Sequence, residues 1–268
     1  MAGGFENPSH MRKLILFFVA ATAMAQVPDG DQHWAMRAEG HQGGHAQAAQ
    51  VDAAIAAYRK AIAQNPNDIE ARWKLLRAIR FKGAYAATTS EAKKSVYDEG
   101  RKAGDEALPL ARGKTGPDAA EIYLWDAAIW GEWALAYGKM AAVRQGAADR
   151  IKREATLAMQ LDPKLEGGGP ARVLGRLYNQ TPHVPFLTGW ASDKEAVRLL
   201  NESLKMDPTN KITKVFLAEA MADNDSATKP AAIALLRDVV KAPNDPNYEV
   251  EQAAATDDAR ALLKSWGA

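Results

Sequence analysis

Apolar residues recur every three or four positions in almost every segment after Val51, and no stretch alternates apolar and polar residues over the length of a strand. This spacing gathers apolar side chains on one face of an α-helix. We therefore expect an all-α fold. A helix that opens at Ser192, with Glu195 as its capping-box partner, ends before Pro208. The other predicted helices span residues 46–64, 67–83, 90–108, 117–144, 147–161, 170–178, 211–222, 230–241 and 256–266.

Prolines divide these helices at intervals. A residue that precedes proline is disfavoured in the α conformation, so a helix tends to end there. Proline is also favoured in the first turn of a new helix. The dividing prolines are 38 to 51 residues apart, which predicts a repeat built from two helices per unit. They are Pro66, Pro117, Pro163, Pro208 and Pro246.

In two of the units, the second helix carries a small residue, a large one four positions later, a small one after three more and a proline after five more. Ala54, Tyr58, Ala61 and Pro66 fit at every step, and Ala196, Leu200, Ser203 and Pro208 fit with conservative changes. First helices carry Leu-Gly and an aromatic residue, as at Leu174, Gly175 and Tyr178. This pattern resembles the tetratricopeptide repeat. The resemblance implies a helical-hairpin solenoid of about four elongated repeats with a C-terminal helix, and a non-enzymatic scaffold that binds a partner protein or peptide.

A narrower resemblance covers roughly residues 70–264. The order "GGGPARVLGRLY", a proline-containing loop, then "EAVRLLNESLKMDPTN" is similar to the T-component family of TRAP transporters. That resemblance implies an exported protein that binds a periplasmic solute-binding protein and forms a homo-oligomer. Many family members carry a lipidated Cys after the signal peptide, whereas Gln26 stands there in this chain.

The first 25 residues read as a leader. Within "MRKLILFFVAATAMA" (residues 11–25), two basic residues precede a short apolar run and small residues at a cleavage position. This order is typical of a secretory signal peptide cleaved after Ala25. The alternative, an uncleaved anchor, needs about 20 apolar residues, more than the run provides. Residues 1–10 read as an upstream leader. We expect a periplasmic or secreted protein that is not membrane-embedded after cleavage, with a flexible segment over 26–50 and the repeat domain over 51–268.

Composition excludes several classes of function. The net charge is +1 and the chain has no cluster of basic residues, so nucleic acid is not an expected partner. Cysteine is absent, which rules out disulfides, thiol catalysis and Cys-based zinc sites. His41 and His45 lack an intervening carboxylate, and Gly43 and Gly44 weaken a helix between them. We expect no metal, no cofactor and no catalytic residues.

The stretch "EIYLWDAAIWGEWALAYGKM" (residues 121–140) is the most unusual in the chain. Tyr123, Trp130, Trp133 and Tyr137 share one helical face with Asp126, whereas Trp125 points elsewhere. One interpretation is packing between helices, with Asp126 paired to Arg72, Arg77 or Arg172. The other is a pocket for a small apolar ligand, with Asp126 as its polar anchor. The predicted ligand or partner groove comprises Trp73, Tyr123, Asp126, Trp130, Trp133, Tyr137, Arg172 and Tyr178.

Overall fold

The computed structural model describes Met1 and residues 26–183 and 188–268, and the predicted signal peptide lies outside these ranges. The described part of the chain contains helices and no β-strand, which confirms the all-α prediction. The helices are α2 (Gln26–Ala35), α3 (Ala48–Gln64), α4 (Ile69–Phe81), α5 (Ser90–Ala111), α6 (Pro117–Tyr137), α7 (Lys139–Arg144), α8 (Ala147–Leu161), α9 (Leu165–Gln180), α10 (Asp193–Met206), α11 (Lys211–Asn224), α12 (Lys229–Lys241) and α13 (Glu249–Trp266). A π-helical turn, η1 (Lys82–Ala86), and two 3-10 turns, η2 (Ser226–Thr228) and η3 (Pro246–Tyr248), join them.

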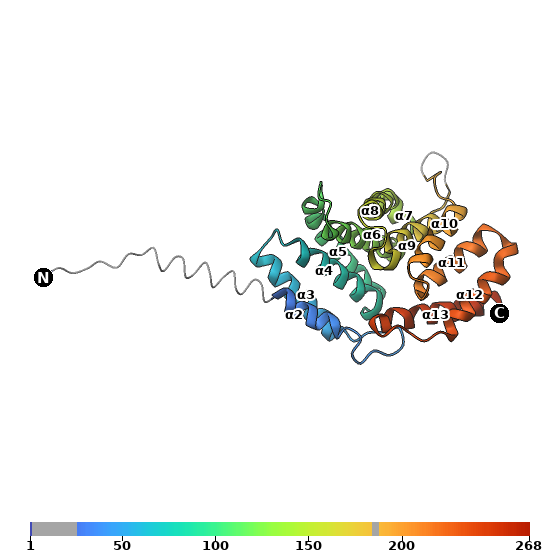
Figure 1. Ribbon diagram of the computed structural model, residues 1–268, viewed down its shortest axis with the longest axis horizontal. Coiled ribbons are helices and arrows are strands. Elements are labelled where there is room, and N and C mark those ends of the chain that lie inside the picture. The colour runs from blue at the N-terminus through green and yellow to red at the C-terminus, as the bar shows by residue number, and fades with distance from the viewer. Residues whose placement is uncertain (2–25, 184–187) are drawn as a thin grey trace.

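The helices pack as consecutive antiparallel pairs of a solenoid. Within the described ranges the pairs are α2/α3, α4/α5, α6/α8, α9/α10 and α11/α12, with the short α7 inserted between α6 and α8. Figure 1 shows the pairs following one another around an arc. Contacts between pairs run from α4 to α6, from α8 to α9 and from α10 to α11, so a continuous interior joins neighbouring units.

The residues of the repeat pattern have the packing role that their sizes predict. Tyr58, Ala54 and Ala61 are buried on α3. Gly175 on α9 is packed against Leu200 on α10, because a Cβ at Gly175 would lie 2.6 Å from the Leu200 Cγ. The absence of a side chain at this position lets the two helices of the unit approach closely.

Residues 26–50 differ from the flexible segment expected from their composition. They contain α2, which pairs with α3 and completes a first unit. Gly30 lies against the ring of Tyr58, whose hydroxyl donates to Asp31 at 2.8 Å. The Trp34 ring packs edge-on against Phe81 at 5.4 Å. The abundant Gly and Gln obscured the helical periodicity of this segment, and it is fixed by contacts with residues farther along the chain.

Several helix boundaries differ from the predicted ones, because a glycine with positive φ or a side-chain cap sets the end of the helix. Gly138, with a φ of 88°, ends α6 earlier than expected and separates it from α7. Pro109 lies in the last turn of α5 and does not break the helix, because the carbonyl that its missing N–H leaves free belongs to the exposed Asp105. Asp68, and not Asn67, caps α4 by accepting from the Ala71 N–H at 2.9 Å. The predicted cap of Ser192 on the Glu195 N–H is present at 3.3 Å.

The C-terminal helix closes the solenoid. Helix α13 begins at Glu249, seven residues before the predicted start, and packs on α11 and α12. Its N-terminal end reaches η1 of the second unit, and Val250 is buried in the same core cluster as Val51 and Ile55 of the first unit. Figure 1 shows α13 running along the open side of the arc toward α2 and α3.

Candidate functional site

Two aromatic side chains near the end of α6, Trp130 and Trp133, are packed between helices, whereas Tyr137 is exposed. Trp130 and Trp133 are 3% and 4% exposed, with ring centroids 5.7 Å apart, and Trp133 stacks on Tyr137 at 4.6 Å. The Trp133 Nε1 donates to Asp98 Oδ1 on α5 at 2.8 Å, and the Tyr137 hydroxyl donates to the other oxygen of Asp98. The Arg101 guanidinium lies 3.9 Å from the Trp130 ring centroid. These contacts join α5 to α6.

The predicted aromatic face is divided between two clusters. Tyr123 is buried with Leu76 and Ile122, whereas Trp130 and Trp133 belong to a cluster with residues of α8 and α9. Trp73 is half-buried on α4, where its Nε1 donates to Asp118 at 2.9 Å. The structure therefore brings together only part of the predicted groove.

Asp126 lies between these two clusters and is 0% exposed. Its partner is Arg150 on α8, which donates from Nε and Nη2 at 3.0 Å each, and the predicted partners Arg72, Arg77 and Arg172 lie elsewhere. Helix α8 packs directly on α6, so its arginine reaches Asp126 across the pair. The internal Asp-Arg pair of the packing interpretation is therefore present, although with a different arginine.

A second carboxyl group shares this site. Glu154 is buried beside Asp126, and burial together with the hydrogen bond and charge of Asp126 raises the pKa of Glu154 to about 9. Arg150 lies 3.1 Å from Glu154 and so contacts both carboxyl groups. The raised pKa keeps the proton on Glu154 at neutral pH, which reduces the negative charge that Arg150 has to balance in this buried site. Gly104 on α5 makes room for Asp126, because a Cβ there would lie 1.8 Å from Asp126 Oδ1.

Charged side chains line the inner side of the arc. Arg80 on α4 donates to Glu132 on α6 at 2.6 Å, and Arg176 on α9 donates to Glu219 on α11. Asp258 on α13 faces the same region, since the charges of Arg176 and Glu132 both act on its pKa. Each member of this set lies close enough to another member for their charges to interact or for a hydrogen bond to form. We call the set the inner charged surface, and it comprises Arg77, Arg80, Glu121, Glu132, Glu166, Arg172, Arg176, Glu219 and Asp258.

Two arginines of the inner charged surface form no ion pair with any described residue. Arg77 lies over the rings of Trp34 and Trp73 at 4.2 and 4.9 Å, and its buried Nε has no hydrogen-bond partner among the described residues. Arg172 donates to the Glu166 backbone carbonyl at 3.1 Å and to Thr213 at 3.4 Å, and burial lowers its pKa. The sequence indicated Arg77 only as a partner for Asp126.

Glu121 is a carboxyl group of the inner charged surface whose pKa is shifted close to neutrality. Burial, followed by the nearby charge of Glu166, raises the pKa of Glu121 to about 7. The Trp125 Nε1 donates to its carboxylate at 2.7 Å, which partly opposes this shift. Nothing in the local sequence indicated this shift, because Glu166 comes from a different unit of the solenoid.

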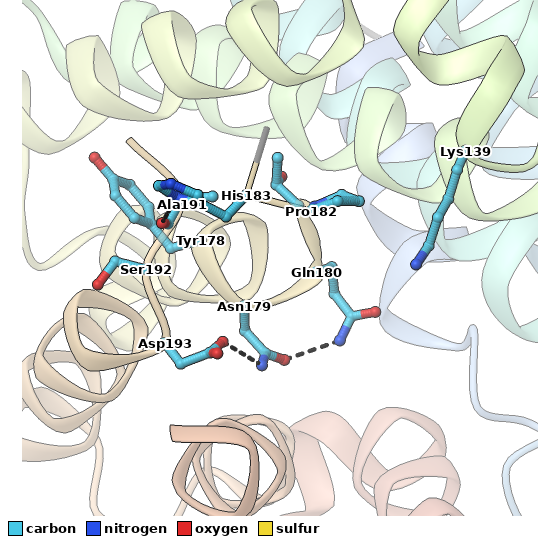
Figure 2. Close-up of a pocket in the computed structure, with 10 residues that line it drawn as sticks. Lys139, Tyr178, Asn179, Gln180, Pro182, His183, Ala191, Ser192 and Asp193 are labelled. Atoms are coloured by element: carbon cyan, nitrogen blue, oxygen red, sulfur yellow. Dashed lines mark hydrogen bonds between the residues drawn. The ribbon is translucent and has the colours of Figure 1, made fainter. Parts of the chain in front are cut away.

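Tyr178 packs against the cluster that contains Trp130 and Trp133, and it also lines a polar cavity of about 240 Å³ (Figure 2). Its ring packs edge-on against Trp190 at 5.1 Å. Figure 2 shows Lys139 on one side of the cavity and Asn179 bonded to Asp193, at 3.1 Å, on the other. Most of the side chains that line this cavity are hydrogen-bonding groups, so it is not the apolar pocket considered from the sequence.

Two further observations concern the described ranges alone. No group of three or more His, Asp or Glu side chains there is arranged to hold a metal ion. Among the helices of the same ranges, none combines the length and the apolar character that crossing a bilayer requires.

The sequence matches no described protein family and no curated protein. Among solved structures, the fold is similar to that of a thermophilic TPR protein from Thermus thermophilus. The similarity has a TM-score of 0.54 at 17% identity and covers 87% of this chain and 98% of that one. The fold is thus tetratricopeptide-like, in agreement with the helix pairing.

The close contact between α5 and α6 predicts that Gly104→Ala is destabilising. The added methyl group would collide with the buried Asp126 carboxylate, so we expect a loss of about 1–3 kcal/mol in the free energy of unfolding. Gly131→Ala is the matched control, because it lies inside α6 and an added Cβ there would meet nothing within 4 Å. Alanine there should be neutral or stabilising by up to about 1 kcal/mol. Urea unfolding of both variants tests this, and equal effects would contradict it.

The raised pKa of Glu121 predicts a pH dependence of stability. The folded protein keeps the proton up to about pH 7, whereas the unfolded chain releases it near the ordinary value of 4.5. Folding therefore binds a proton in this window, and the contribution of Glu121 to stability falls as the pH rises through it. Glu121→Gln keeps an acceptor for Trp125 and removes the titration. Melting temperatures from pH 4.5 to 8 should decline less in this variant, and parallel curves would contradict the assignment.

Proposed function

We propose that this protein is a scaffold that holds a partner protein or peptide against the inner charged surface. The tetratricopeptide-like fold supports a binding role, because stacked helix pairs present an extended concave surface. The observation that carries the proposal is that two arginines on that surface, Arg77 and Arg172, are unpaired within the described ranges. A half-buried guanidinium without a carboxylate has lost part of its hydration, and a carboxylate from a partner would compensate it with a charge-assisted hydrogen bond.

We further propose that the scaffold is exported and that its partner is a solute-binding protein of a TRAP-type transporter. The support is the signal-peptide pattern of residues 11–25 and the similarity of residues 70–264 to the T-component family. Homo-oligomerisation belongs to the same proposal.

Export predicts a defined N-terminus for the mature protein. Expression of the full-length chain in a Gram-negative host should yield a periplasmic form whose N-terminal sequence begins at Gln26. Replacing Arg12 and Lys13 with Glu should retain the chain in the cytoplasm, because the basic start of a signal peptide is needed for its insertion. N-terminal sequencing of fractionated cells provides the measurement, and an uncleaved cytoplasmic product from the unaltered gene would refute export.

Partner binding predicts a specific loss on removal of one inner arginine. Tagged mature protein should recover a solute-binding protein from its own periplasm. Arg172→Gln should weaken that complex at least about tenfold, because a charge-assisted hydrogen bond contributes about 1.5–3 kcal/mol. Arg144→Gln, at an exposed position of α7 and without an ion pair to any described residue, is the control.

Titration calorimetry gives the affinities, and thermal melts establish that both variants remain folded. Equal affinity in Arg172→Gln and the unaltered protein would exclude the inner charged surface as the binding site. Recovery of no solute-binding protein would refute the TRAP assignment and leave the general scaffold open to other partners.

A further inference from the structure

The N-terminal end of α13 covers the first unit of the solenoid from the far end of the chain. Val250 is fully buried among residues of α3. Ala254 lies against the backbone of Gly44, where an added Cβ would be 2.5 Å from the Ala254 Cα. These contacts join segments about two hundred residues apart, so they turn an open arc into a closed ring.

One buried arginine is the centre of this closure. Arg37 donates from Nε to Glu251 Oε1 at 3.1 Å and from Nη2 to the Asn247 backbone carbonyl. Its guanidinium lies over the Trp34 ring at 4.4 Å and near the Tyr248 ring at 5.9 Å. The side chains of Arg37 and Glu251 are only 10% and 9% exposed.

The two ends of α13 are held by different kinds of contact. Toward its C-terminus, Ala255 and Ala259 pack with Leu236 and Val239 of α12 in an apolar cluster. Toward its N-terminus, Val250 supplies one large apolar contact with the first unit, and the rest of the attachment depends on the ion pair of Arg37, whose desolvation cost offsets much of its Coulomb energy. The second oxygen of Glu251 is buried without a hydrogen-bond partner among the described residues, which adds to that cost. The N-terminal end is therefore the weaker attachment.

The same end of α13 reaches one of the unpaired arginines. The Tyr248 hydroxyl donates to Glu166 on α9 at 3.3 Å, and the charge of Glu166 acts on the pKa of Arg172. Burial and the charge of Glu166 together raise the pKa of Tyr248 to about 12, so its hydroxyl stays protonated as a donor at neutral pH. Closure thus places a side chain of the returning segment next to the proposed binding residue.

We propose that residues 247–254 form a latch that closes the solenoid and limits access to Arg172, with the Arg37–Glu251 pair holding it shut. Opening separates this segment from the first unit while the remainder of α13 stays on α11 and α12. The latch itself is independent of any ligand, and its role in partner admission rests on the proposed function.

Amide hydrogen exchange on the mature chain tests the latch. Arg37→Met leaves Glu251 buried and unpaired, so exchange over residues 247–254 should accelerate at least about tenfold, while α11 and α12 keep their protection. Glu251→Gln, which preserves shape, should act in the same direction. Arg260→Met is the matched control, because its ion pair with Asp257 is exposed on the same helix. Unchanged exchange in both latch variants, or acceleration spread equally over all helices, would overturn the proposal.

Arginine modification measures access without a partner. Phenylglyoxal should modify Arg172 at least about tenfold faster in Glu251→Gln than in the unaltered protein, with Arg144 as the internal reference. Equal rates at Arg172 would overturn the claim that the latch limits access. If Arg172 is modified faster in Glu251→Gln but no partner is recovered, the latch is supported and the proposed function is refuted. If a partner binds but the modification rates are equal, the proposed function is supported and the latch is refuted.

Discussion

The close approach of helices at positions without a large side chain is the constraint on which the rest of this structure depends. A Cβ at Gly83 would lie 2.3 Å from the Tyr97 ring, and one at Gly100 would lie 3.0 Å from both Ile79 and Ile129. At each of these glycines, a large side chain lies where the Cβ of an alanine would crowd it. Because this device recurs along the solenoid, the stack has a dense interior with little room for a ligand between its layers.

This dense packing explains why Trp130 and Trp133 of α6 fill the interior and do not line a ligand pocket. An aromatic cluster on one helical face is compatible with packing or with a pocket, and the sequence alone does not distinguish them. Arg101 and Arg150 both lie over the Trp130 ring, at 3.9 and 4.6 Å, and Asp98 accepts from Trp133. Cations, rings and carboxylates therefore fill this space, although the buried Trp130 Nε1 and Arg101 Nε have no hydrogen-bond partner among the described residues. Arg77 and Arg172, two half-buried arginines without an ion pair to any described residue, lie instead on the inner side of the arc.

The local sequence pattern predicted most of the helices, whereas the contacts between distant segments could not be predicted from the sequence. The predicted span 147–161 is identical to α8, and the cap at Ser192 is present, because both depend on residues within a few positions of each other. The partner of Asp126 was assigned incorrectly, since three-dimensional packing brings Arg150 to it. The pairing of α2 with Tyr58 and the return of α13 were missed for the same reason. Of the candidate site, the sequence indicated Arg172 but not the raised pKa of Glu121, which depends on a residue of another unit.

Ring closure changes what the tetratricopeptide-like fold implies for binding. An open solenoid offers its concave surface permanently, so affinity depends only on the contacts made there. In a closed ring the apparent affinity also depends on how often the returning helix is released, because only the open fraction is competent to bind. A closure held by a buried ion pair and small side chains is more easily released than one held by a large apolar interface. Arg37 and Glu251 occupy a position where apolar residues would hold the two segments together more strongly. Their ion pair fixes how α13 aligns with the first unit and keeps the closure weak enough to open.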